Sequence, residues 1–353
     1  MNDRVKKLLE EKIDNLNKPK GSLGRLEALA LQVGLAQETL SPALCRPWHF
    51  LFAGDHGIEA EGVSASPREV TWQQCENYVR GGGGVNVFCR QHGFGLSVVD
   101  VGVDHEFEGG VKAAIVDRKI RRGTRNFLYE AAMTAEEWQQ ALTVGREMVD
   151  EVWREGTNVV CFGEMGVGNT SASSVLMHLL TGIELERCVG AGSGLTSDGV
   201  RHKLEVLRQA VNCYRQAVGR EGMNDAGLVG RWFCGYEMAA AVGGMIEAAR
   251  RKMLFLVDGF IMTACAMLAE EMVKNDARFS IPDFRLYVIY GHVGDECGHR
   301  LMLDWLGVQP LLSLGMRLGE GTGALCAWPI LDSAVRLLNE MDNFYHARIT
   351  KYF

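Results

Sequence analysis

The chain has 353 residues, of which 47% are hydrophobic and 23% charged, and its formal net charge is −7. This composition is that of a globular protein with a large core, arranged as one large domain with an appendage or as two domains. Charges of both signs are interspersed and no long basic tract occurs, which argues against nucleic acid and anionic membranes as partners.

Cysteine and histidine usage points to a reducing compartment. The ten cysteines form no Cys-x-x-Cys pair and the nine histidines no His-x-x-x-His pair, so we expect buried thiols, no disulfide framework and no metal site. The charged N-terminus lacks the apolar core of a signal peptide, and apolar runs such as Met238–Ile246 are too short and glycine-rich to span a bilayer. We therefore expect a cytoplasmic protein.

The spacing of apolar residues, glycines and prolines divides the chain into helices and strands. The first part predicts helices over residues 2–16 and 25–39 around a breaker-rich turn, a strand over 48–53, a helix over 66–80 that begins near Pro67, and a strand over 96–101. The middle predicts a strand over 113–116, a helix over 134–154, a strand over 158–162, and helices that begin near residues 171 and 198. The last part predicts a helix over 235–249, strands over 253–257 and 286–290, and a helix over 322–341 that Pro329 starts or kinks.

The order of these elements predicts the fold class. Strands that alternate with helical stretches are typical of an α/β protein with a mostly parallel sheet that helices cover on both faces. The helical N- and C-termini would join as a small second domain. We therefore expect residues 1–35 and 331–353 to form the two parts of a small helical domain, and residues 36–330 to form the large domain.

Polar residues follow three of the predicted strands. Asp55 and His56 follow the first strand, Asp258 a later one and His292 the last. Because ligands bind at the carboxyl ends of parallel strands, these side chains face the expected active side, although a solvated Asp-His turn is an equally simple interpretation of the first pair. Glu237, embedded among Met, Ala and Gly, is a further carboxylate in an apolar setting.

A glycine-rich loop, Gly163–Thr170, lies between a predicted strand and a predicted helix. Such loops present backbone N–H groups and a helix N-terminus to phosphate. The spacing nearly matches the P-loop signature, but Asn169 stands where that signature requires lysine, so we exclude an ATPase or kinase and keep phosphate binding, with Glu164 beside it. A second glycine run, Gly190–Gly194, is a weak match for a dinucleotide motif, and Lys203 on the next helix is either a phosphate ligand or an exposed lysine.

The stretch Leu314–Gly323 holds a single carboxylate, Glu320, between two glycines and three residues after Arg317. Glycine makes poor helix and poor strand, and it allows the backbone to approach a ligand closely. We interpret the stretch as a turn that aims one carboxylate at a ligand; a turn with a solvated glutamate is the simpler alternative. A carboxylate that acts as a base near neutral pH needs a raised pKa, which a dry pocket would provide and contact with Arg317 would oppose.

Six motifs, in order along the chain, resemble those of the nicotinate-nucleotide–dimethylbenzimidazole phosphoribosyltransferase family (CobT). They are Lys18–Glu27, Ala53–Gly57, Gly62–Pro67, Gly163–Thr170, Val257–Phe260 and Met316–Gly323. The resemblance covers residues 17–341 and rests on the combination, not on a single motif. It implies a cytoplasmic homodimer with a Rossmann-like sheet, a small domain built from both chain ends, and neither a metal nor an organic cofactor.

The resemblance also implies a reaction. Members of the family transfer phosphoribose from nicotinate mononucleotide to a lower-ligand base such as 5,6-dimethylbenzimidazole, which gives α-ribazole 5′-phosphate and nicotinate in cobalamin nucleotide-loop assembly. The alternatives are a homologue that activates a purine or a phenol, one subunit of a heteromer, and an inactive ligand-binding homologue. Trp72 and the segment Gly194–Ser197 leave the choice of base open.

The resemblance assigns site residues as well. Glu320 matches the catalytic base, and Glu164 matches a second active-site glutamate near the ribose. The base pocket is matched by Ser66, Gln74 and Leu318. The residues that fall on the phosphate and ribose side are Gly166, Gly168, Asn169, Thr170, Gly192, Gly194 and Lys203.

Overall fold

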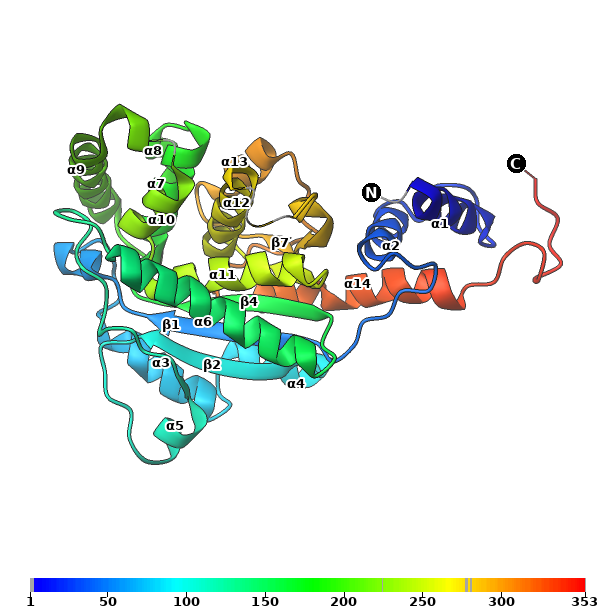
Figure 1. Ribbon diagram of the computed structural model, residues 1–353, viewed down its shortest axis with the longest axis horizontal. Coiled ribbons are helices and arrows are strands. Elements are labelled where there is room, and N and C mark those ends of the chain that lie inside the picture. Colours follow the sequence, from blue (N-terminus) through cyan, green and yellow to red (C-terminus); the bar gives the residue numbers. More distant parts are fainter. Residues whose placement is uncertain (1–2, 224, 277–278, 280, 353) are drawn as a thin grey trace.

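The computed structural model describes residues 3–223, 225–276, 279 and 281–352. Its centre is a six-stranded sheet in the order β3-β2-β1-β4-β5-β6, and every neighbouring pair of strands runs parallel (Figure 1). The strands are β1 (Trp48–Gly54), β2 (Gly95–Gly102), β3 (Val116–Asp117), β4 (Val159–Met165), β5 (Leu254–Val257) and β6 (Val288–Tyr290). The strand order reverses between β1 and β4, which is where open parallel sheets bind their ligands. The predicted fold class is confirmed.

Helices cover both faces of this sheet (Figure 1). The α-helices of the described residues are α1 (Asp3–Asn15), α2 (Arg25–Ala36), α3 (Glu69–Val79), α4 (Gly84–His92), α5 (Gly109–Ala114), α6 (Ala135–Arg154), α7 (Asn169–Thr181), α8 (Leu185–Cys188), α9 (Ser197–Gly222), α10 (Ala226–Phe233), α11 (Tyr236–Arg250), α12 (Phe260–Asn275), α13 (His299–Leu306) and α14 (Thr322–Glu340). Helix α11 packs on β1, β2, β4 and β5 together with α6 and α12, whereas α3, α4 and α14 contact the strands from the other face. Within the described residues, no helix is long and apolar enough to cross a membrane.

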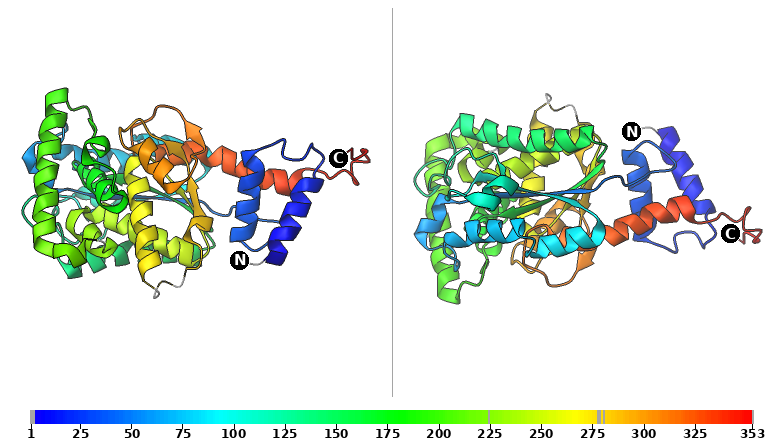
Figure 2. Two further views of the ribbon diagram at one scale, coloured as in Figure 1. Left: turned by 90° about the horizontal axis from the view of Figure 1, so that it is seen from above. Right: turned by 90° about the horizontal axis from the view of Figure 1, so that it is seen from below.

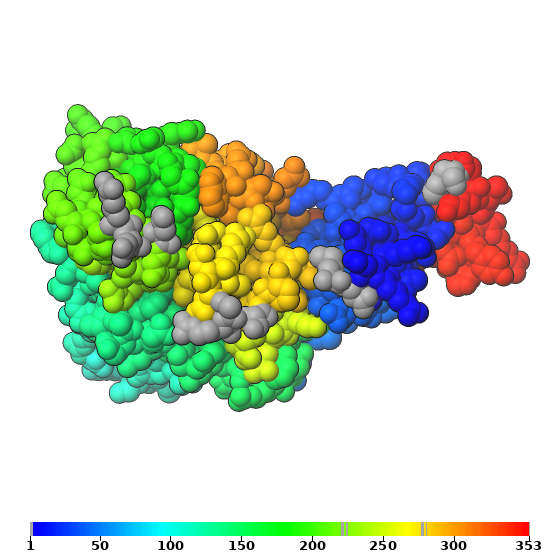
Figure 3. All heavy atoms as spheres, turned by 45° about the horizontal axis from the view of Figure 1, so that its top comes forward, coloured from blue at the N-terminus to red at the C-terminus, as the bar shows by residue number. Residues whose placement is uncertain are grey.

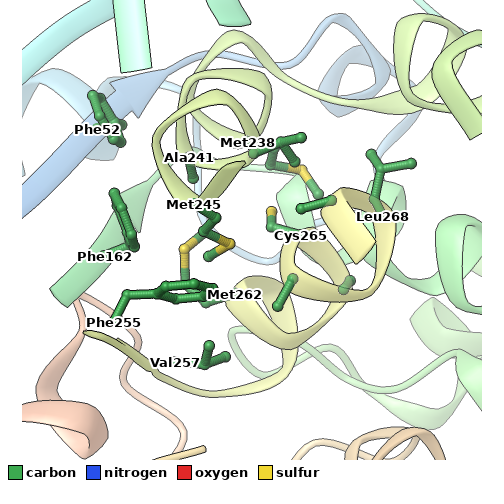
Figure 4. Packing of buried hydrophobic residues seen from close by; sticks show 14 of the residues in the cluster. Phe52, Phe162, Met238, Ala241, Met245, Phe255, Val257, Met262, Cys265 and Leu268 are labelled. Carbon is green, nitrogen blue, oxygen red and sulfur yellow. The ribbon is translucent and has the colours of Figure 1, made fainter. Parts of the chain in front are cut away.

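The middle of the core joins the central strands to α11 and α12 (Figure 4). Phe52 of β1, Phe162 of β4 and Phe255 of β5 lie side by side, with ring centroids 6.4 Å apart in the first pair and 6.1 Å apart in the second. The two helices add Met238, Ala241, Met245, Met262, Cys265 and Leu268 to the same core. Because Glu237 immediately precedes Met238 in the first turn of α11, the same packing fixes the position of that carboxylate.

The two ends of the chain meet at one end of the molecule (Figures 2 and 3). Helix α2 packs against both α1 and α14, and Leu16 and Asn343 form an antiparallel bridge. The side-chain amide of Gln32 on α2 donates to the carbonyl oxygens of Leu286 (3.1 Å) and Val288 (2.9 Å), which fastens the terminal helices to the edge of the sheet. The predicted boundary after residue 330 lies within α14, so the division into a small and a large domain at residues 35 and 330 stays a prediction.

Several predicted elements differ from those observed. The helix predicted over 66–80 begins at Glu69, so Pro67 lies before its first turn. The strand predicted over 113–116 is wrong, since α5 occupies residues 109–114 and only residues 116–117 pair with β2 as the edge strand β3. In the strand predicted over 286–290, residues 286 and 287 belong to a 3-10 helix.

Helix α4 was not expected at all. It begins within the glycine run 81–84, which the sequence indicated as the end of α3. Gly83, the residue before the helix, has no side chain to cap it. Instead, Asn86, the third residue of the helix, accepts a hydrogen bond from the N–H of Gly83 through its side-chain oxygen at 2.9 Å. Helix α14 begins at Thr322 and continues past Pro329, which therefore does not start it.

Candidate active site

A cavity of about 300 Å³ opens beside the carboxyl end of β4. Its walls come from the segment before α3 and α3 itself, from the end of β4 and the start of α7, from the second glycine run, and from the turn before α14. Ten of the twelve residues that the resemblance assigned to the site line this cavity; the other two are Gly194 and Lys203. Segments more than 250 residues apart in sequence therefore meet at the point where the strand order reverses.

The turn Gly319-Glu320-Gly321 has an unusual backbone. Its three residues have φ angles of 82°, 62° and 80°, so a glutamate lies between two glycines in the left-handed region, at a cost of about 1–2 kcal/mol for a residue with a side chain. The N–H and the hydroxyl of Thr322 both donate to the carbonyl of Gly319, at 3.0 and 2.8 Å. A Cβ on Gly163 of β4 would lie 2.4 Å from the carbonyl oxygen of Glu320, so the turn rests directly on the strand.

The carboxylate of Glu320 points at the start of α4. Its Oε2 accepts a hydrogen bond from the N–H of Val85 at 3.0 Å, and the N–H of Gly84 and the hydroxyl of Tyr78 also interact with it. Burial raises the pKa of Glu320 above its ordinary value, while these three donors oppose the rise because they favour the anion. No ion pair joins Arg317 to Glu320 among the described residues, so the opposing contact considered from the sequence is not made.

Glu164 is the second carboxylate of the cavity. It lies on β4, which continues to Met165, and not in a loop as the sequence indicated. Its Oε2 accepts a hydrogen bond from the side-chain amide of Asn169. Burial raises the pKa of Glu164 to about 8, and the carboxylates of Glu237 and Asp258 add to the rise. A Cβ on Gly319 would lie 2.6 Å from Oε1 of Glu164. Because Gly319 has no side chain, the carboxylate of Glu164 can lie close to the turn that holds Glu320.

The wall that is expected to bind phosphate is formed by the start of α7. Gly168, with a φ angle of 101°, precedes the helix, and Asn169 and Thr170 form its first turn, so backbone N–H groups and the positive end of the helix dipole lie at the cavity wall. Lys203 of α9 is almost fully buried, and its Nζ donates to the hydroxyl of Thr170 at 2.9 Å. Burial lowers the pKa of Lys203 to about 8, and within the described residues it makes no ion pair with a carboxylate. An anion beside Thr170 would supply the missing countercharge.

The wall that is expected to bind the base combines polar groups with an apolar rim. The side-chain oxygen of Gln74 accepts a hydrogen bond from Asn77 at 3.2 Å, which leaves its NH2 group to donate to a ligand. Ser66 lies on the same wall, and Leu318 forms the rim with a side chain that is 59% exposed. Trp72 is not part of this wall, because its ring stacks on that of His105 with centroids 4.4 Å apart.

A buried pair holds the helix that follows Glu320. Asp258 Oδ1 accepts from the N–H of Ala324 at 3.0 Å, in the first turn of α14, and lies 3.2 Å from Nε2 of His292. Burial lowers the pKa of His292, but its hydrogen bond and charge interaction with Asp258 outweigh this and the pKa is raised. A Cβ on Gly323 would lie 2.0 Å from the His292 ring, so the histidine wedges directly beneath the helix start. The two polar strand ends therefore act as supports, not as walls of the cavity.

The remaining polar residues at strand ends are also not on the cavity wall. Asp55 is buried, and its Oδ2 accepts from the N–H of Asp104 at 2.8 Å. His56 is fully buried against Glu237, so the interpretation as a solvated turn is wrong for both. Five polar wall residues were not assigned from the sequence, namely Ser64, Tyr78, Ser193, Glu296 and Arg317. Of these, Tyr78 had a usable signal, because it follows Gln74 by four residues on one helix face.

Comparison with known families matches residues 1–349 to a family described as phosphoribosyltransferase. The nicotinate-nucleotide–dimethylbenzimidazole phosphoribosyltransferase of Parabacteroides distasonis is 56% identical over 346 residues, which cover 98% of this chain and 95% of that protein. The enzyme of the same name from Bacteroides fragilis is 53% identical over 351 residues, covering 99% of this chain and 97% of that protein. The chain belongs to this family. The resemblance noted from the sequence motifs is confirmed.

Solved structures of the nicotinate-nucleotide–dimethylbenzimidazole phosphoribosyltransferase family share the fold. The crystal structure of CobT from Thermus thermophilus superposes with a TM-score of 0.90 at 37% identity and covers 99% of this chain and 100% of that chain. A second crystal structure of the enzyme from the same organism gives 0.89 at 36% identity, with complete coverage of both chains. In the described part of this chain, no three His, Cys, Asp or Glu side chains are grouped so as to hold a metal ion.

Proposed function

We propose that this chain transfers phosphoribose from nicotinate mononucleotide to 5,6-dimethylbenzimidazole, and so makes α-ribazole 5′-phosphate and nicotinate for cobalamin nucleotide-loop assembly. The observation that carries the proposal is a cavity with two buried carboxylates, Glu320 and Glu164, between a phosphate-binding wall and a base-binding wall, in a member of this family. The relatives' name specifies the substrates, and the cavity provides a group for each of them.

The transfer is a displacement at C1 of the ribose. One ring nitrogen of dimethylbenzimidazole gives its proton to Glu320, and the lone pair of the other nitrogen forms a bond to C1. The bond from C1 to the pyridine nitrogen breaks, and its electron pair stays on the ring, which turns the cationic ring into nicotinate. Attack on the face opposite the leaving group inverts the β linkage into an α linkage. No acid is required at the leaving group.

The surroundings of Glu320 suit a general base. Burial raises its pKa towards the operating pH, and a base is most effective when its pKa lies there. The donors Val85 and Tyr78 fix the carboxylate on one side. Its orientation therefore does not depend on the substrate, which favours a productive geometry.

Glu164 and the start of α7 act on the other substrate. The carboxylate of Glu164 stabilises the positive charge that moves onto the ribose as the glycosidic bond breaks. Five assigned residues lie on the phosphate wall, namely Gly166, Gly168, Asn169, Thr170 and Gly192, and Lys203 reaches it through Thr170. We assign Gly194 no contact, since it does not line the cavity.

We further propose a cytoplasmic homodimer without a metal or organic cofactor. The terminal segments that project from one end of the molecule carry exposed apolar side chains, including Leu8, Leu23, Tyr345 and Ile349. Exposed apolar side chains on a projecting segment are suited to contact with a second copy. Light scattering coupled to size exclusion measures the mass directly, and a monomer at micromolar concentration would contradict the dimer.

The reaction is tested with purified protein, nicotinate mononucleotide and a panel of bases. Release of nicotinate and formation of α-ribazole 5′-phosphate with dimethylbenzimidazole are expected, with slower turnover of adenine and p-cresol. Turnover of a purine or a phenol in preference to dimethylbenzimidazole would favour the alternative base specificities. Absence of turnover with every azole, purine and phenol, in protein shown to be folded, would overturn the proposal.

A further inference from the structure

A buried acid-histidine pair lies directly behind the cavity. His56 follows β1, and Glu237 lies in the first turn of α11, where the helix dipole favours a negative charge. His56 Nε2 and Glu237 Oε1 are 2.5 Å apart, and neither side chain is exposed. The pair sits where the strand order reverses, but the proposed mechanism does not use it.

This pair is a poor source of stability. Taking an acid and a base out of water costs several kcal/mol per ion, and apolar side chains of similar size often stabilise a fold equally well or better. In addition, His56 Nδ1 and Glu237 Oε2 find no hydrogen-bond partner among the described residues. An unpaired buried polar atom typically costs about 1–3 kcal/mol. Such an arrangement calls for a role other than stabilisation.

The loop of the phosphate wall rests on the pair. A Cβ on Gly166 would lie 3.2 Å from Glu237 Oε1, 3.3 Å from the His56 ring and 2.4 Å from the carbonyl of Gly54. A Cβ on Gly168 would lie 3.2 Å from that of His56. The loop therefore passes so close to both members of the pair that a side chain at residue 166 would push it away.

The pair also places charge beside Glu164. Burial has the largest effect on the pKa of Glu164, and the charge of Glu237 has the next largest. The other groups that act on it are Asp258 after β5, Glu320 before α14 and the amide of Asn169 on α7. Of these groups, Glu237 also lies beside the loop of the phosphate wall, as does Asn169, whose N–H donates to the carbonyl of Gly166 at 3.2 Å.

We propose that His56 and Glu237 are a positioning pair for the proposed phosphoribosyl transfer, which hold the Gly166–Gly168 loop against the phosphate and keep a second carboxylate beside Glu164. The inference rests on the proposed function. The second carboxylate delays ionisation of Glu164, so that its negative charge is fully present only when the positive charge of the substrate lies next to it. His56 keeps Glu237 in this position.

The test compares two glutamates of the same helix. Glu237→Gln removes the charge and keeps the size. Glu247→Gln is the matched control, because Glu247 is 2% exposed on α11 and ion-paired to Arg250 and Arg251, away from the cavity. For each protein, kcat/KM for nicotinate mononucleotide is measured against pH, together with the melting temperature.

In the wild type, the rising limb of the kcat/KM profile has its inflection near pH 8, where Glu164 ionises, and loss of the Lys203 proton lowers kcat/KM at higher pH. Glu237→Gln moves this inflection to lower pH by about one unit, at the lower end of what a neighbouring charge contributes. Glu237→Gln also raises KM for nicotinate mononucleotide by about tenfold. This is less than the roughly hundredfold loss of rate expected when a substrate is misplaced by about 1 Å. Glu247→Gln leaves both unchanged. A Glu237→Gln profile that coincides with the wild type, with only the melting temperature lowered, would overturn the inference.

If Glu237→Gln does not fold, Glu237→Asp replaces it. The shorter side chain keeps the charge near Glu164 but withdraws from His56, so we expect an unchanged inflection and a raised KM. A shifted inflection, or an unchanged KM, would overturn the inference. A wild type without turnover would instead contradict the proposed function, so the two failures are distinguishable.

Discussion

Replacing Glu164 by glutamine should stabilise the protein, and the gain should grow with pH. The side chain is buried, its hydrogen-bond donor is the amide of Asn169, and burial raises its pKa from 4.5 to about 8. Glutamine has the same size and accepts the same hydrogen bond, but it has no proton to lose. The substitution therefore removes the cost of ionising a buried carboxylate and leaves the packing in place.

The sign and size of the effect follow from proton linkage. Below pH 4.5 the side chain is protonated in both the folded and the unfolded chain, so its full contribution to stability is present. Between pH 4.5 and about 8 the unfolded chain has lost the proton and the folded chain has not, so stability falls by about 1.4 kcal/mol per pH unit. The loss reaches about 5 kcal/mol at pH 8 and then stays constant, because both states are ionised.

Equilibrium urea unfolding at about pH 5, 6, 7 and 8 measures this difference between the wild type and Glu164→Gln. Glu151→Gln, an exposed substitution on α6, should stay within about 0.5 kcal/mol of the wild type throughout. The same variant that gains stability should lose turnover, since the charge it lacks is the one that stabilises the ribose. A stability difference that is independent of pH, or a variant less stable than the wild type at pH 8, would refute the reasoning.

Three further predictions concern the turn and the phosphate wall. Glu320→Gln should lower kcat by about a hundredfold, the scale of a general base, and a kcat within about threefold of the wild type would remove Glu320 from that role. Gly321→Ala should lower the melting temperature more than Gly182→Ala does: both glycines have φ near 80° (80° and 75°), but a Cβ on Gly321 would lie 2.1 Å from His49, whereas nothing lies within 4 Å at Gly182. Equal losses in the two alanine variants would show that the turn has room to move. Lys203→Met should raise KM for nicotinate mononucleotide by about tenfold or more, the loss of a charge-assisted hydrogen bond, and the wild-type KM should rise above about pH 8 as the lysine loses its proton. A KM that the methionine leaves unchanged would place the phosphate elsewhere.

The fold was predictable because its main signals are local. The run over Trp48–Ala53 is apolar and is followed by glycine. Thr134 caps the start of α6, where its hydroxyl accepts a hydrogen bond from the N–H of Glu137 at 3.2 Å. The elements that were missed depend on partners far away in the chain. Strand β3 exists only where Val116 and Asp117 reach the edge of β2. A two-residue edge strand has no periodicity of its own.

Most of the residues expected at the site line one cavity, but the residues that support them were not predictable. The glycine motifs and the two glutamates are marked in the sequence, since glycines on both sides of a carboxylate are a local pattern. Glu237 was noticeable as a carboxylate in an apolar helix, but its partner His56 is 181 residues away. Helix α4, which supplies the N–H of Val85 to Glu320, begins in a glycine run that is typical of a loop. Charge and hydrogen-bond partners of this kind appear only when the sheet brings the segments together.

The two carboxylates of the cavity differ in what surrounds them, and this difference divides their roles. Glu320 faces the N–H of Val85 and the hydroxyl of Tyr78, which favour its anion, whereas Glu164 faces Glu237 and Asp258, which oppose it. When the cavity holds one negative charge, these surroundings favour its location on Glu320, the group that we propose accepts the proton of the base. Binding of the cationic nucleotide favours the anion of Glu164, whose proton is released to water before the transfer step. Its stabilising effect is then largest in the transition state, which is where binding energy accelerates a reaction.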